Sequence, residues 1–128
     1  MKGPESVTEY LDEILREDKR YPEMAYRFVL EALNNIIRSL PDPRHISGEE
    51  LCFGCRDMAI EEFGPMARTV LEHWNIRSTE DLGEIVFNLV AKGLLSKTNE
   101  DKKEDFIDVY DFETAFDAPV TNGGMEDS

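Results

Sequence analysis

The chain has 128 residues, of which 14 are basic and 28 acidic, so its formal net charge is −14 at pH 7. Hydrophobic residues make up 41% of the chain, which excludes wholesale disorder and is enough for one self-sufficient core. So acidic a surface repels phosphate backbones and anionic lipids, and the composition therefore argues against nucleic-acid and membrane partners.

The sequence also bears on the compartment. No apolar run approaches the roughly 18 residues that a membrane span needs, and no signal-peptide pattern opens the chain. The two cysteines, with no export signal before them, are typical of a reducing environment. We therefore expect a cytoplasmic protein.

Two helices are predicted within the first 40 residues. Ser6 and Glu9 have the spacing of a capping box, and apolar residues follow them at helical intervals. Pro22 suits the first turn of the second helix, where its missing N–H is not needed. The apolar arc of that helix spans about 200°, so we expect it to lie deep in the fold until Pro41 ends it.

Three further helices and two strands are predicted in the rest of the chain. Ser47 and Glu50 form a second capping box at the start of a helix over 47–63, which Gly64 ends. A short helix and a longer one follow over 65–74 and 78–92. After Gly93 the period changes, and residues 94–98 and 106–112 are expected to form a β-hairpin around a charged loop.

This order predicts a mainly α domain of the α+β class, over residues 1–116. Two N-terminal helices precede a winged-helix-like core, at about residues 44–112, in which three helices are followed by the C-terminal β-hairpin. Residues 117–128 lack apolar periodicity and are predicted to be a disordered acidic tail. The winged-helix order is an analogy of fold, and a fold does not by itself imply a function.

The chain also resembles a family of uncharacterised bacterial proteins of unknown function over about residues 20–116. The resemblance rests on spaced matches that include Arg20-Tyr21-Pro22, Arg44-His45-Ile46-Ser47-Gly48, Phe63-Gly64-Pro65, Trp74, Asp81-Leu82-Gly83-Glu84-Ile85-Val86-Phe87-Asn88-Leu89-Val90 and Gly93-Leu94-Leu95-Ser96-Lys97. It supports the domain limits and implies no activity, substrate or partner. The family pattern has no cysteine pair after Glu50-Leu51, so it assigns no role to Cys52 and Cys55.

Cys52 and Cys55 are weak candidates for a metal or redox site, because two residues separate them as in many such pairs. The helix dipole stabilises a thiolate only within the first helical turn, and Cys52 lies beyond that turn. A closed zinc site needs four ligands, and the histidines that could join the pair are His45 and His73. We predict that both thiols pack in the core, with a small metal- or thiol-dependent protein as the alternative.

Two other groups of residues are candidate binding sites. Arg44, His45 and Ser47 stand at the predicted start of a helix, where an anion or a partner could bind; the alternative is that local acids and the capping box already satisfy them. The helix over 78–92 has a second apolar flank that must be covered, and Gly83, Phe87 and Ala91 on that flank are a candidate interface. The N-terminal helices or a second copy of the chain are the expected covers.

These features predict a non-catalytic protein-interaction or self-association module, regulatory in character, with a protein partner or a homodimer. No phosphate-binding loop, nucleophile elbow or metalloprotease motif is present, so we expect no enzyme, no catalytic residue and no cofactor. The alternatives are the metal- or thiol-dependent protein and, third, a winged-helix DNA-binding regulator. The net charge of −14 opposes the third, as does the acidic polar stripe of the helix that would enter the major groove.

Overall fold

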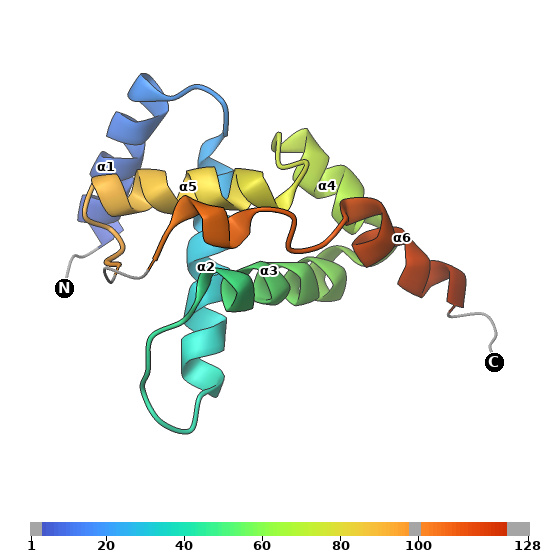
Figure 1. The fold of residues 1–128 in the computed structure, drawn as a ribbon. Coiled ribbons are helices and arrows are strands. Elements are labelled where there is room, and N and C mark those ends of the chain that lie inside the picture. The colour runs from blue at the N-terminus through green and yellow to red at the C-terminus, as the bar shows by residue number, and fades with distance from the viewer. Residues whose placement is uncertain (1–3, 98–100, 123–128) are drawn as a thin grey trace.

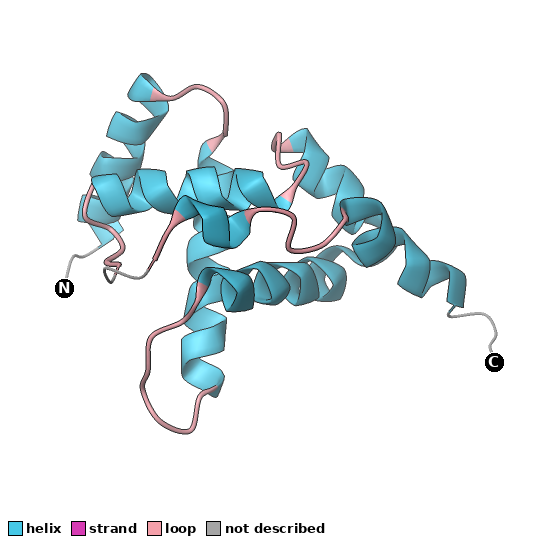
Figure 2. Ribbon diagram, viewed as in Figure 1, coloured by secondary structure: helices cyan, strands magenta, loops and turns pink. Residues whose placement is uncertain are grey.

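The structure, a computed structural model, describes residues 4–97 and 101–122, with side chains for 7–97 and 101–117. Helices and loops make up these residues, as Figure 2 shows. The elements in chain order are α1 (Pro4–Glu17), α2 (Glu23–Ser39), α3 (Gly48–Phe63), the 3-10 helix η1 (Gly64–Met66), α4 (Ala67–His73), α5 (Thr79–Ala91), the 3-10 helix η2 (Lys103–Phe106) and α6 (Phe112–Asn122).

The middle of the molecule is a crossing of three long helices (Figure 1). Helices α3 and α5 run side by side, and α2 crosses behind both and contacts both. The short η2 lies in front, between α5 and α3, and touches each of them. Helix α1 lies at one end of this arrangement, while α4 and α6 lie at the other end.

Helix α2 is deeply buried, as its wide apolar arc predicts. Its buried residues are Ala25, Tyr26, Phe28, Val29 and Ala32. The ring of Phe28 lies 5.6 Å from that of Trp74 and 6.3 Å from that of Phe63, between centroids. This aromatic cluster joins α2 to the end of α3 and to the residue after α4, and so fixes the helix that forms the floor of the site described below.

The predicted start of α3 is confirmed. The Glu50 N–H donates to Ser47 Oγ at 3.1 Å, and the Ser47 N–H donates to Glu50 Oε1 at 2.9 Å, so both halves of the capping box are present. The Arg44 guanidinium adds two bonds to the Glu50 carboxylate, at 3.0 and 2.7 Å. The helix ends at Gly64, whose φ of 54° is a conformation that favours glycine.

Glu50 should therefore contribute to the acid stability of the protein. Its bonds to Arg44 and to the Ser47 N–H lower its pKa from 4.5 to about 2. Because the pKa is lower in the folded state, this stabilisation is complete above the unfolded pKa and is lost as the pH falls from 4.5 towards 2. Glu50→Gln should flatten the acid limb of stability in that window and cost about 1 kcal/mol or less at neutral pH, since the pair faces solvent.

The measurement is urea unfolding of the wild type and the variant across that pH window. Glu49→Gln is the matched control, because it removes the same charge from the same turn while leaving the capping box intact. Equal acid profiles for the two variants would contradict the role given to Glu50.

The predicted β-hairpin is wrong, because the described residues contain no strand. Residues 94–95 form a bend, residues 96–97 have no regular structure, and residue 98 lies outside the described residues. Over 106–112, Phe106 ends η2 and Phe112 begins α6. Between them Asp108 has a positive φ of 52°, a conformation that a strand does not contain. The core from 44 to 112 therefore has three helices without a wing.

Acidic side chains explain why this region turns helical. The Asp105 carboxylate accepts the Lys102 N–H at 3.0 Å, at the start of η2, and the Asp111 carboxylate accepts the Thr114 N–H at 3.0 Å, at the start of α6. Both are helix-capping bonds of a kind that aspartate commonly makes. The hairpin prediction places Asp105 in its loop and Asp111 near the end of its second strand, whereas in the structure both residues cap helices.

Helix α6 also takes in residues 117–122, which the sequence places in a disordered tail. Phe112 and Phe116 are one turn apart, both are buried, and their rings lie 5.1 Å apart. Asp117 accepts a hydrogen bond from Arg68 of α4 at 2.7 Å. Residues 123–128 of the predicted tail lie outside the described residues.

Candidate functional site

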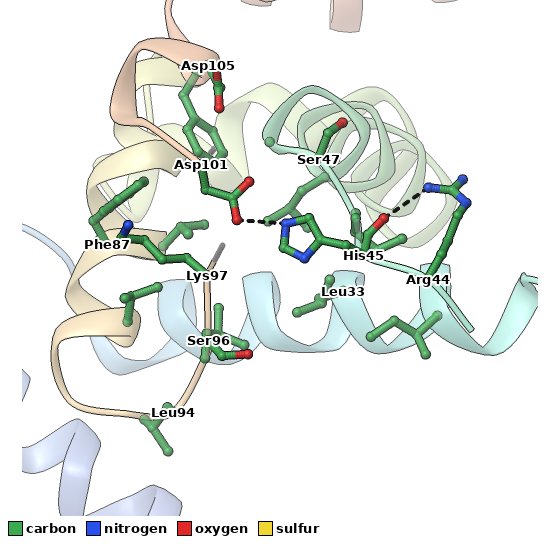
Figure 3. A pocket seen from close by; sticks show the side chains of 18 residues that line it. Leu33, Arg44, His45, Ser47, Phe87, Leu94, Ser96, Lys97, Asp101 and Asp105 are labelled. Carbon is green, nitrogen blue, oxygen red and sulfur yellow. Dashed lines mark hydrogen bonds and ion pairs between the residues drawn. The ribbon is translucent and has the colours of Figure 1, made fainter. Parts of the chain in front are cut away.

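A cleft of about 310 Å³ opens between α2, the start of α3 and α5. Apolar side chains from these helices, from the loops that follow α2 and α5, and from η2 form its walls, namely Leu33, Ile37, Ile46, Leu51, Val86, Phe87, Val90, Leu94, Leu95 and Phe106. Polar side chains stand among them, and Figure 3 shows Arg44, His45, Ser96, Lys97 and Asp101 around the opening. Such a cleft, apolar with a few polar groups, is the usual form of a binding site.

The wall on the α5 side depends on a close approach between α5 and η2. The rings of Phe87 and Phe106 meet edge to face, with centroids 6.3 Å apart. Phe106 reaches this position because residue 83 is glycine: a Cβ there would lie 2.8 Å from the Phe106 Cβ. The apolar flank of α5 is thus partly covered by η2, a cover that the sequence did not predict.

The three candidate interface residues are separated by this packing. Gly83 is buried beneath Phe106, Phe87 lines the cleft and is half-buried, and Ala91 is exposed. The three residues do lie on one helix at the expected spacing, but they do not form one exposed surface, because Phe106 of the same chain covers Gly83.

Thr79 holds η2 in place, and sequence reasoning missed this role. It is fully buried, and its hydroxyl donates to the Phe106 carbonyl at 2.6 Å. The same oxygen accepts the Val109 N–H at 3.2 Å. The sequence suggests Thr79 as a helix cap, and nothing local indicates that its side chain bonds a segment 27 residues away.

The predicted anion-binding residues do come together at the cleft, but other groups already satisfy them. The His45 Nε2 lies 2.7 Å from an Asp101 carboxylate oxygen, and these two side chains point toward each other in Figure 3. Arg44 bonds Glu50 and the His45 carbonyl. Ser47 is engaged in the capping box. This arrangement favours an apolar group in the cleft over a free anion.

Cys52 and Cys55 lie in the core, away from this cleft. Both are free thiols and at most 1% exposed. Burial raises the pKa of Cys52 to about 12 and raises that of Cys55 as well. The Tyr110 hydroxyl donates to the Cys52 carbonyl at 2.7 Å, which pins this part of α3 to the segment before α6. Within the described ranges, no three His, Cys, Asp or Glu side chains are placed to share a metal ion.

Both thiols should be inert in the folded protein. Ellman's reagent attacks the thiolate, and a buried thiol with a raised pKa supplies almost none at about pH 8. We expect the native chain to react no faster than it unfolds, and two thiols per chain to react at once in concentrated guanidinium chloride. One thiol reacting rapidly in native buffer would contradict the core assignment.

Comparison of the chain with protein-family models, curated proteins and solved structures finds no match. The resemblance to uncharacterised bacterial proteins therefore stays a prediction. Among the described helices, none has both the length and the apolar character needed to cross a membrane. Function must be argued from the cleft itself.

Proposed function

We propose that the chain is a non-catalytic, cytoplasmic interaction module whose cleft receives apolar side chains of a protein partner. One observation carries the proposal: ten of the 18 lining residues are apolar, while Arg44 and His45 at the opening are paired with acids of the same chain. Such a site offers apolar contact in its centre and a polar rim, which is the usual composition of a protein interface.

The His45–Asp101 pair is the feature closest to catalytic machinery. A histidine base of this kind acts on a nucleophile that is hydrogen bonded to the other ring nitrogen. In the described part of the chain, no hydrogen bond joins the His45 ring to a Ser, Thr or Cys side chain, and its ion-pair partner is Asp101. The two thiols are buried elsewhere. These facts support a positioning role for the pair, which joins the loop before α3 to the segment before η2 across the cleft.

Photo-cross-linking inside the native cell tests this proposal. A benzophenone amino acid replaces Ser96, which is exposed at the cleft, or Ile107, which is 55% exposed and does not line it. We expect a discrete cross-linked protein from position 96 and none from position 107. That protein, once purified, should bind the wild-type chain and bind a Val90→Asp variant much more weakly.

Two results would contradict the proposal. The first is equal labelling from both positions or from neither. The second is a purified cross-linked protein that binds wild type and Val90→Asp equally, provided that the variant keeps the wild-type circular dichroism spectrum.

A further inference from the structure

We propose that the occupant of the cleft is the Ile37 side chain of a second copy of this chain, so that two copies form a symmetric dimer. This inference rests on the proposed function, because it names the partner for the same cleft. Ile37 lines the cleft and yet is 45% exposed, whereas Leu33, one turn earlier on α2, is half-buried. The same patch therefore carries both a hollow and a projecting apolar side chain.

A patch of this kind is complementary to itself. In a two-fold dimer the same surface of each chain meets its counterpart, so that any contact made by one copy is made in return by the other. Ile37 of each copy then lies against the partner's wall of α5 side chains, where Val86, Phe87 and Val90 are half-buried. The contact removes both the Ile37 side chain and the α5 wall from water, and the burial of this apolar surface stabilises the dimer.

The formal charge of the cleft lining favours contact with a second copy at this face. Among the residues that the structure describes, the charged ones of the lining are Arg44, Lys97, Asp101 and Asp105, so their formal charge with His45 neutral is zero. The net charge of −14 therefore comes from residues outside this described lining. Two such chains repel one another through their acidic surfaces, but this face meets its copy without excess charge of either sign. A strongly basic partner, by contrast, would be attracted to the other faces.

The size of the patch predicts a weak dimer. Some lining residues, such as Leu51 and Phe106, are buried and offer little surface to a partner, so the patch is smaller than the roughly 800 Å² per partner of a standard stable interface. We therefore expect a dissociation constant on the order of tens of micromolar. Such an association forms and dissociates readily, which fits a regulatory module.

Sedimentation equilibrium of the purified full-length chain tests the proposal. Raising NaCl from about 50 to about 500 mM shortens the Debye length to a few ångströms, so the repulsion between chains falls and dimerisation should strengthen several-fold. Ile37→Lys should raise the dissociation constant at least about 100-fold, because two buried isoleucines per dimer are lost. Ile37→Ala should weaken the dimer less, with no risk to the fold.

Met24→Lys is the matched control. Met24 is on the same helix, is 56% exposed and does not line the cleft. Both lysine variants reduce the net charge from −14 to −13, which alone would favour association. Dimerisation that is retained in Met24→Lys and lost in Ile37→Lys supports the proposal.

Three results would overturn the dimer. They are a monomer at every salt and protein concentration, equal losses in the two lysine variants, and a dimer that weakens as salt rises, which would mean that ion pairs hold it. The proposed function fails separately. A monomeric chain that still cross-links another protein from position 96 refutes the dimer alone, and the absence of any cross-link from position 96 refutes the interaction module.

Discussion

Thr79→Val should lower the free energy of unfolding by about 2–4 kcal/mol, the largest effect expected of any single conservative change here. Valine has nearly the same shape as threonine but cannot bond the Phe106 carbonyl or the Val109 N–H, which Thr79 serves at 2.6 and 3.2 Å. Because Thr79 and Phe106 are buried, water does not readily replace the bond between them. Urea unfolding of the two proteins measures the difference.

Thr79→Ser is the control for this change. Serine keeps the hydroxyl and loses a methyl group, so it should cost only about 1 kcal/mol. Amide exchange gives a second readout: in Thr79→Val the Val109 amide should lose protection more than amides in α2. A serine variant that loses more stability than the valine variant would show that packing of the methyl group, and not the hydroxyl, holds η2 against α5.

Gly83→Ala should destabilise the protein by about 1–2 kcal/mol, although alanine is normally favoured over glycine inside a helix by about 1 kcal/mol. The added Cβ would lie 2.8 Å from the Phe106 Cβ and 2.9 Å from its Cγ. These atoms are close to the backbone of η2, so relief of the clash requires the whole segment to move. Thermal and urea unfolding should both report the loss.

Gly54→Ala tests the same principle at a site where the added methyl group should cost little or no stability. A Cβ at residue 54 of α3 would lie 2.4 Å from the Ile36 Cδ1 and 2.9 Å from its Cγ1, as close an approach as at residue 83. Both atoms lie beyond the Cβ of a half-buried side chain that can change rotamer, so the backbone of α2 need not move. We therefore expect Gly54→Ala to be neutral within about 0.5 kcal/mol. Equal losses at the two glycines would contradict the account of η2 as a fixed wall.

The helices from α2 to α5 could be predicted from the sequence because their signals are local. The Ser47–Glu50 capping box and the Gly64 stop lie within a few residues of the ends that they determine. The prediction failed after Gly93 because apolar residues there serve distant partners. Phe106 packs on α5, and Phe112 packs on Phe116 one turn later. The four-residue spacing of Phe112 and Phe116 is helical and does not fit the alternation of a strand. The capping bonds of Asp105 and Asp111 are the stronger local signal, and they favour helix starts.

The candidate site was partly predictable for the same reason. Arg44, His45 and Phe87 were singled out from local patterns, and all three line the cleft. The sequence did not reveal that they belong to one site, because residues 44–45 and 87 lie far apart along the chain. Nor did it reveal Asp101 as the partner of His45, since the chain has 28 acidic residues and no local pattern distinguishes Asp101 from the others.

Intermolecular contact between Ile37 and the α5 wall is the central claim, and an isotope-filtered NOE experiment tests it most directly. Chains with ¹³C-labelled isoleucine methyl groups are mixed with unlabelled chains at high salt, where the dimer should be most populated. We predict intermolecular cross-peaks from the Ile37 methyl groups to Phe87 ring protons and to Val90 methyl groups, and none from Ile107, which is exposed outside the cleft. Intermolecular cross-peaks from Ile107 instead, or none at all under conditions where sedimentation shows a dimer, would contradict the account.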